Sequence, residues 1–171
     1  MTFCVSFPPV AQPDARVLIL GTLPGVESLR QGQYYANRHN AFWRIMGELA
    51  GSGPDLPYER RLEKLKGAGF ALWDVCASAT RPGSLDADIQ NMHPHDFAGF
   101  LARHRQIEKI GFNGQHAAKL FGRFVALGLD ETSRKIDCAT LPSTSPAHAS
   151  MRFEQKLERW RELLMPTVAT R

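Results

Sequence analysis

Four short apolar runs alternate with segments of helical periodicity along this chain of 171 residues. The runs lie at residues 16–20, 70–75, 107–112 and 136–141, and the helical patterns lie at residues 41–50, 58–66, 96–105, 115–125 and 150–164. Strands that alternate with helices favour parallel strands joined by helical crossovers. The pattern therefore predicts an α/β fold with a short central parallel four-stranded sheet and helices on both faces.

In open parallel sheets, ligands bind outside the carboxyl ends of the strands. The predicted strands end at residues 21–25, 74–80, 113–114 and 142–148, and the glycines and polar side chains of interest lie on these ends or just after them. No internal repeat, low-complexity tract or linker divides the sequence. We therefore expect one domain over residues 1–171, with a functional site at this edge of the sheet.

The composition is that of a soluble globular protein, with 43% hydrophobic and 22% charged residues. No apolar run approaches the ~20 residues needed to span a bilayer, and the N-terminus lacks a secretory pattern, so we expect a cytoplasmic protein without a membrane partner. The net charge of +4 permits an anionic partner without requiring one. Cys4, Cys76 and Cys138 are too scattered to support a zinc site or a disulfide framework.

Two segments at predicted strand ends hold most of the candidate functional residues. In the first, the strand at residues 16–20 runs into Gly21-Thr22-Leu23-Pro24-Gly25, and Tyr34-Tyr35-Ala36-Asn37-Arg38-His39-Asn40 then precedes a helix that opens with Phe42 and Trp43. The turn matches neither the dinucleotide fingerprint nor the P-loop. The second segment, residues 141–149, reads Leu-Pro-Ser-Thr-Ser-Pro-Ala-His-Ala.

Together these segments resemble the uracil-DNA glycosylase superfamily, and most closely its hypoxanthine-DNA glycosylase branch. The resemblance extends from about Val17 to Trp160. It implies a monofunctional DNA glycosylase of base excision repair that flips a deaminated base, preferably hypoxanthine, out of DNA and hydrolyses its N-glycosidic bond. It further implies a monomer that needs no metal or organic cofactor. Three cysteines cannot build the four-cysteine iron–sulphur site of some other branches.

By this resemblance Asn40 is the catalytic residue. An asparagine cannot act as a general base near neutral pH, but its amide can orient a water by hydrogen bonding. The residues alone support a second interpretation, in which Asn40 caps the helix that follows. Other branches of the superfamily carry an acidic or amide residue where Leu23 stands, and the hypoxanthine branch lacks it.

The resemblance also implies a set of base-binding residues. Tyr35 is expected to stack on the extruded base, and Asn113 is expected to pair with its hydrogen-bonding edge. The turn that wraps the base comprises Gly21, Thr22, Leu23, Pro24 and Gly25. Taken without the resemblance, Tyr35 is equally an interior tyrosine, Asn113-Gly114 an ordinary turn pair, and residues 21–25 a strand-ending turn. Phe42 and Trp43 are expected in the core.

The second segment is similar to the loop that presses into the minor groove and occupies the gap left by the flipped base. Its expected DNA-binding residues are Ser143, Ser145, Pro146, Ala147 and His148. Many relatives place a leucine wedge where Ala147 stands, and His148 could fill the gap instead. Ser143 replaces a histidine or asparagine that stabilises the leaving base in relatives. The alternative is a proline-rich loop before a helix.

Remaining features favour other functions only weakly. His93 and His95 form a His-x-His pair, but nothing fixes a third metal ligand, so no metal is expected. Residues 78–91 are expected to form a long loop. Basic residues near the strand ends suit phosphate contacts: Arg30, Arg38, His39, Arg44, Arg81, Arg134, Lys135 and Arg152.

Two other functions remain open at this point. One is a uracil- or mismatch-specific glycosylase of the same fold. The other is a non-catalytic α/β module that binds a nucleotide or damaged DNA.

Overall fold

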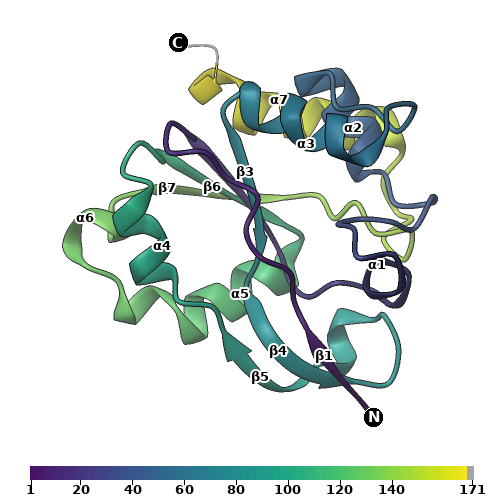
Figure 1. The fold of residues 1–171 in the computed structure, drawn as a ribbon, viewed down its shortest axis with the longest axis horizontal. Helices are drawn as coiled ribbons and strands as arrows, with labels where there is room; N and C mark the ends of the chain where they lie inside the picture. Colours follow the sequence, from purple (N-terminus) through teal and green to yellow (C-terminus); the bar gives the residue numbers. More distant parts are fainter. Residues whose placement is uncertain (169–171) are drawn as a thin grey trace.

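A computed structural model describes residues 1–168 of the chain (Figure 1). Its central sheet has four parallel strands in the order β3-β2-β6-β7. These strands are β2 (Val17–Gly21), β3 (Phe70–Asp74), β6 (Lys109–Asn113) and β7 (Asp137–Leu141). Each lies within two residues of a predicted apolar run. The predicted four-stranded parallel sheet is therefore confirmed.

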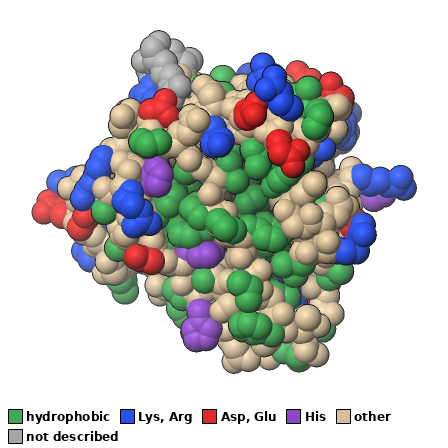
Figure 2. Space-filling view, viewed as in Figure 1, with side chains coloured by type: hydrophobic (Ala, Val, Ile, Leu, Met, Phe, Trp, Pro, Cys, Tyr) green, Lys and Arg blue, Asp and Glu red, His purple; other side chains and the backbone are tan. Residues whose placement is uncertain are grey.

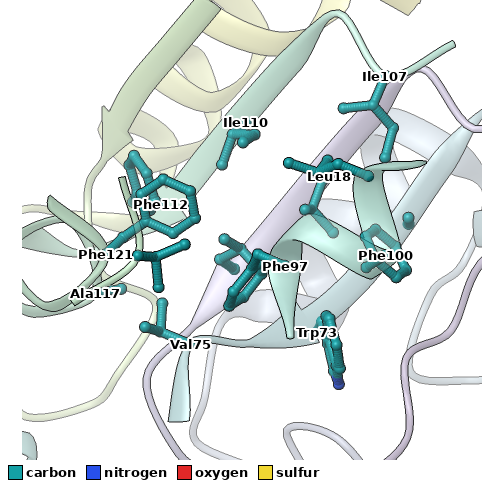
Figure 3. Close-up of a cluster of buried hydrophobic side chains, with 14 of the residues drawn as sticks. Leu18, Trp73, Val75, Phe97, Phe100, Ile107, Ile110, Phe112, Ala117 and Phe121 are labelled. Carbon is teal, nitrogen blue, oxygen red and sulfur yellow. The ribbon is translucent and has the colours of Figure 1, made fainter. Parts of the chain in front are cut away.

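Helices cover both faces of this sheet, as predicted. Leu18 and Leu20 of β2 face a core cluster built with α4 (Phe97–Arg103) and α5 (Gln115–Phe124). Figure 3 shows Leu18, Phe97 and Phe121 within this cluster. Val17 and Ile19 face the opposite cluster, which holds α2 (Phe42–Ala50), α3 (Tyr58–Gly67) and α7 (Phe153–Val168). Because alternate residues of a strand point to opposite faces, a strand buried on both sides is apolar throughout.

The last helix, α7, packs closely on the sheet because β6 carries a glycine there. A Cβ atom on Gly111 would lie 3.0 Å from Leu164 Cδ2 of α7 and 2.9 Å from Leu141 Cδ1 of β7. Trp160 of α7 is fully buried, and its indole Nε1 donates a hydrogen bond to the Pro142 carbonyl at 2.9 Å. This bond fixes the start of the segment that follows β7. The helix begins at Phe153, three residues later than the predicted start at residue 150.

A second, antiparallel sheet was not predicted. Its strands are β1 (Thr2–Val5), β4 (Cys76–Arg81) and β5 (Gln90–Pro94), in the order β1-β4-β5. The expectation of a long loop over residues 78–91 is therefore wrong at both ends. The sequence does not predict these strands, because neither forms an apolar run: β4 is rich in small and polar residues, and β5 is largely exposed.

Several short elements also lie outside the predicted pattern. They are α1 (Val26–Gln31), α6 (Glu131–Arg134) and two 3₁₀ turns, η1 (Asp86–Asp88) and η2 (Ala126–Gly128). Helices this short show too little periodicity to be recognised in a sequence. Across residues 1–168, the structure contains no helix with the length and apolar character required to cross a membrane.

Candidate active site

The carboxyl ends of the parallel strands open into a cavity of about 450 Å³. In Figure 1 this edge lies on the right, where α1, the segment before α2 and the segment between β7 and α7 come together. All of the residues predicted for the site line this one cavity: Gly21, Thr22, Leu23, Pro24, Gly25, Tyr35, Asn40, Asn113, Ser143, Ser145, Pro146, Ala147 and His148. The structure thus brings together segments that are more than a hundred residues apart in the sequence.

Asn40 lies half-buried on the cavity wall, immediately before α2. Its Oδ1 accepts a hydrogen bond from the backbone N–H of Phe42 at 3.0 Å. The helix therefore starts two residues after Asn40, with Ala41 at the cap position, and the asparagine forms a local turn rather than a standard cap. Among residues 1–168, no group accepts a hydrogen bond from Asn40 Nδ2. One lone pair of Oδ1 and both amide hydrogens thus remain for a water or a ligand.

Tyr35 is fixed by contacts to one face of its ring and to its hydroxyl group. Its ring stacks on that of Phe42 with 4.0 Å between centroids and 21° between planes. Its Oη accepts a hydrogen bond from Asn113 Nδ2 at 3.0 Å. The backbone of Tyr35 has a φ of 54°, which is rare for a non-glycine residue and is retained where surrounding contacts enforce it. The aromatic ring of Tyr35 is thus fixed in position on the cavity wall.

Neighbouring aromatic residues have structural roles. Tyr34 is buried, and its hydroxyl donates to the Pro8 carbonyl at 2.9 Å. Trp43 is also buried, and its Nε1 donates to the Tyr34 carbonyl at 2.8 Å. The expectation that Phe42 and Trp43 belong to the core is confirmed.

Asn113 ends β6 and uses both ends of its amide within the protein. Its Nδ2 donates to Tyr35 Oη at 3.0 Å and to Thr144 Oγ1 at 2.9 Å, while its Oδ1 accepts from the Thr144 backbone N–H at 2.9 Å. Both amide hydrogens are therefore engaged. Pairing with a base edge, as expected from the sequence, requires Asn113 to exchange one of these two donor bonds for the base.

Thr144 lines the cavity and was not among the predicted site residues, which included Ser143 and Ser145 on either side of it. Besides its bonds to Asn113, its carbonyl accepts from the Ala41 backbone N–H at 3.0 Å. This buried threonine therefore joins the segment after β7 both to β6 and to the segment that carries Asn40. The sequence carried no signal for it, because three neighbouring hydroxyl residues look alike and only the structure shows that the middle one is buried.

Asp74 is a second cavity residue that the sequence analysis did not name. It ends β3 opposite Gly21 of β2, and its side chain is buried. Its Oδ2 accepts from Ser6 Oγ at 3.1 Å. A Cβ atom on Gly21 would lie 2.5 Å from Asp74 Oδ1 and 2.8 Å from Tyr35 Oη. Only glycine at position 21 lets these two polar groups approach the turn.

Burial raises the pKa of Asp74 from 3.8 to about 7, and the carboxylate of Asp86 acts in the same direction. The Ser6 hydroxyl and Arg81 oppose this shift. Near neutral pH the cavity therefore holds a carboxyl group that is protonated in a large share of the molecules. A polar residue ending an otherwise apolar strand was the signal for Asp74 in the sequence.

Leu23 packs into an apolar cluster with Cys4, Cys76 and Ala79. A carboxylate at this position would be surrounded by apolar side chains, at a substantial desolvation cost. The turn at residues 21–25 is anchored by Arg81, whose Nη2 donates to the Pro24 carbonyl. Arg81 is buried and also lies 3.6 Å from Asp86. Its expected phosphate contact is therefore wrong, because the guanidinium supports the turn from inside.

The segment at residues 143–148 is shaped by its own hydroxyl groups and by α7. Ser143 Oγ accepts from the Ser145 N–H, and Ser145 Oγ accepts from the Ala147 N–H, both at 3.2 Å. Lys156 of α7, itself buried, donates from Nζ to the His148 carbonyl at 2.8 Å. Pro146 and Ala147 are exposed at the mouth of the cavity. The segment is thus a supported loop that presents small side chains to solvent.

The basic residues named from the sequence do not form one surface. Arg134 and Lys135 belong to the α6 region before β7, at the amino end of the sheet and away from the cavity, so their expected position near the strand ends of the site is wrong. Arg44 lies over the Phe153 ring at 3.9 Å. Arg38 and His39 are exposed in the segment before α2. Figure 2 shows Lys or Arg side chains projecting, with a histidine, from this right-hand edge.

No group of three His, Cys, Asp or Glu side chains in residues 1–168 is arranged to hold a metal ion. His95 stacks on Trp73 at 4.0 Å, and burial lowers its pKa to about 4. His95 thus belongs with the packed residues of the sheet.

Comparison with known proteins finds relatives that are similar to this chain in sequence and in fold. Residues 8–164 match the family model described as uracil DNA glycosylase superfamily. The chain is 35% identical over 153 residues to a hypoxanthine DNA glycosylase of Methanosarcina acetivorans, covering 89% of this chain and 91% of the relative. It is 34% identical to a hypoxanthine DNA glycosylase of Methanosarcina barkeri, covering 72% and 79% respectively. The fold is also similar to a solution NMR structure of a Methanosarcina acetivorans protein described as a uracil DNA glycosylase. The two superpose with a TM-score of 0.75 at 33% identity, and the match covers 95% of this chain and 99% of that one.

Proposed function

The chain belongs to the uracil DNA glycosylase superfamily and is a DNA glycosylase, and we propose that it releases hypoxanthine from deaminated DNA by hydrolysing the N-glycosidic bond. The family and the enzyme class are those predicted from the sequence. The preference for hypoxanthine draws on the two Methanosarcina relatives, which carry that name and are similar over most of their length.

One observation carries the proposal: the Asn40 amide and the Tyr35 ring line the same cavity at the carboxyl ends of the strands. Hydrolysis of an N-glycosidic bond leaves positive charge on the sugar and negative charge on the departing base. The reaction needs an oriented water and a holder for the flat base, and it needs little proton abstraction. An amide and a fixed aromatic ring meet these needs.

Asn40 orients the attacking water in this scheme. Its Oδ1 keeps one lone pair beyond the bond to Phe42, and its Nδ2 keeps two hydrogens. The water oxygen forms a bond to the sugar C1′ as the bond from C1′ to the base nitrogen breaks. The electron pair of the broken bond leaves with the base, which takes a proton from solvent, and the water proton is released to solvent.

Tyr35 supplies the stacking surface for the extruded base. Its ring is backed by Phe42, so the aromatic plane is already in position to receive a base. Stacking of a base on an aromatic side chain contributes about 1–3 kcal/mol. Asn113 reaches the base edge when Nδ2 exchanges its bond to Tyr35 for hypoxanthine O6 and Oδ1 accepts from N1–H.

The protonation state of Asp74 determines whether a second negative charge lies in the cavity when the anionic base leaves. In its protonated form it places no negative charge in a cavity from which an anionic base must depart. Its carboxyl lies beside Gly21 and close to the Tyr35 hydroxyl, on the wall that the turn at residues 21–25 completes. We therefore expect the protonated form of Asp74 to be the active one.

The DNA partner is bound through exposed groups at the cavity edge. Arg38 and His39 are placed to contact phosphates, which position a duplex without reading its sequence. The loop at residues 143–148 faces the groove. We propose a monomer that acts on deaminated bases in the cytoplasm, and the roles given to these residues require no metal or organic cofactor.

Base release from matched duplexes tests this function. Duplexes that contain one deoxyinosine, deoxyuridine or deoxyxanthosine are incubated with the protein, and alkali then converts abasic sites to strand breaks. Release chiefly from deoxyinosine, with no breaks before alkali, supports the proposal. Release chiefly from deoxyuridine would assign the protein to a uracil-removing branch, against the apolar packing of Leu23. No release from any duplex would leave a non-catalytic DNA-binding module.

A further inference from the structure

The mouth of the cavity carries large exposed apolar side chains that no role above uses. Leu85 and Val26 both line the cavity, yet they remain 56% and 57% exposed. Pro146 and Ala147 add smaller exposed apolar groups from the loop at residues 143–148. The opening through which a base must enter is therefore bordered by apolar atoms on more than one element.

Leu85 is presented by a supported segment. The neighbouring Ser84 Oγ accepts from the Val26 backbone N–H at 2.9 Å, which attaches the segment to the start of α1. The Leu85 carbonyl accepts from the Asp88 N–H at 3.1 Å, which starts the turn η1. On the inner side, Arg81 joins Asp86 to the Pro24 carbonyl. The position of Leu85 is thus fixed relative to the turn that lines the cavity.

The charge around Leu85 indicates what it faces. Residues 82–88 contain no lysine or arginine and include Asp86 and Asp88. Such a segment is unsuited to phosphate contact, whereas an apolar tip suits the stacked bases inside a duplex. Arg38 and His39, which are exposed between the cavity residues Asn37 and Asn40, are the groups that suit phosphates.

A base that leaves a duplex opens a gap in the stack, and proteins that hold DNA in such distorted states insert apolar side chains, leucine among them, between bases. Ala147 offers a single methyl group, which cannot fill this gap. Val26 branches at Cβ and reaches less far from the backbone than a leucine. Leu85 is the longest exposed apolar side chain among those that line the cavity.

We propose that Leu85 enters the base stack beside the target nucleotide and holds the gap open while the base lies in the cavity. This inference rests on the proposed function, because it assumes a duplex from which a base is extruded. It assigns duplex opening to the segment between β4 and β5, which lies far in sequence from the loop at residues 143–148.

The test uses 2-aminopurine placed next to a 2′-fluorinated deoxyinosine, which resists cleavage, in a duplex opposite deoxycytidine. Extrusion of the base unstacks its neighbour, so saturating parent protein should raise the fluorescence. Leu85→Ala should lose at least half of that rise, and its rate of base release from deoxyinosine in duplex should fall about tenfold, because one apolar insertion offsets part of the unstacking cost. Leu85→Met, which keeps an apolar side chain of similar volume, should behave as the parent.

Leu127→Ala is the matched control, because Leu127 is 82% exposed and lies in η2, outside the cavity lining. A fluorescence rise with Leu85→Ala equal to that of the parent, or no rise with the parent itself, would overturn the inference. Base release by the parent is scored separately. A parent that cleaves deoxyinosine while Leu85→Ala matches it removes the role of Leu85 and leaves the proposed function standing.

Discussion

Asn113 and Thr144 hold each other through both ends of the asparagine amide: Nδ2 donates to Thr144 Oγ1 and Oδ1 accepts from the Thr144 N–H, each at 2.9 Å. Because the Thr144 carbonyl also accepts from Ala41, this pair joins the end of β6, the segment after β7 and the segment that carries Asn40. The remaining hydrogen of Asn113 Nδ2 fixes the Tyr35 hydroxyl. The relative placement of Asn40 and Tyr35 thus depends on a threonine that contacts no substrate in our proposal.

Replacing Thr144 by valine keeps its shape and removes the acceptor for Asn113. A buried amide hydrogen then loses its partner, which costs about 1–3 kcal/mol of stability. We expect a lower midpoint in urea unfolding and a fall in base release, whereas Thr144→Ser should restore both. Thr140→Val, on an exposed position of β7, is the control. Parental stability and activity in Thr144→Val would contradict the role of this junction.

Adding a methyl group at Gly21 tests the close approach of Asp74 and Tyr35. The new Cβ would lie 2.5 Å from Asp74 Oδ1, so the carboxyl and the Tyr35 hydroxyl must move apart. Misplacement of about 1 Å in an active site can cost roughly a hundredfold in rate, and we expect a loss of this order in Gly21→Ala. Gly122→Ala, where nothing lies within 4 Å in α5, should keep full activity and slightly raise the melting temperature.

The stability of the protein should depend on pH through Asp74. Its pKa is about 7 in the folded chain, whereas an Asp side chain exposed to water, as in the unfolded chain, has a pKa of 3.8. The folded protein therefore binds this proton more tightly than the unfolded chain. The stabilisation from the protonated carboxyl is complete below about pH 4 and is lost as the pH rises towards 7, reaching a few kcal/mol at most.

The Asp74→Asn variant carries a permanently neutral group at this position. It should therefore gain stability over the parent at pH 8 and show little difference at pH 4. Melting curves of both proteins across this range provide the measurement. A variant less stable than the parent at pH 8 would mean that the folded protein favours the carboxylate.

The same group predicts how base release varies with pH. Ionisation of Asp74 above pH 7 places an anion in the cavity beside a departing anionic base, so the single-turnover rate of the parent should decline there. Asp74→Asn should retain activity at pH 7 and lose the alkaline decline. A decline that persists unchanged in the variant would assign it to another group.

Much of the fold was predictable because β2, β3 and nearly all of β6 are buried on both faces and form short apolar runs, and the mostly exposed edge strand β7 still ends in one. The cavity residues were predictable because parallel strands bring their carboxyl ends to one edge. The second sheet was not, since β4 and β5 bury only part of their surface and their pairing depends on contacts between distant segments. The role of Arg81 was predicted wrongly for a related reason, because its burial decides that role and a sequence does not display the burial of a single charged residue.

The roles of Tyr35 and Asn113 were only half predictable. Their residue types indicated stacking and amide recognition, and both do line the cavity. The hydrogen bond between their side chains joins residues 78 positions apart, and no local sequence pattern predicts it. The same holds for Lys156, whose ammonium supports the His148 carbonyl from a helix that the sequence presents only as an amphipathic tail.

We propose that Asn40 has two roles: it accepts a hydrogen bond from the Phe42 N–H, and it orients the water that attacks the sugar. The most direct measurement is the single-turnover rate of hypoxanthine release from a deoxyinosine duplex by the parent and by Asn40→Ala, with enzyme in excess and duplex binding measured in parallel. We predict a fall of about a hundredfold or more, of the size seen when an active-site hydrogen-bonding group is removed, with the affinity for the duplex nearly unchanged. Release by Asn40→Ala at the parental rate would contradict the account and leave Asn40 as a turn residue only.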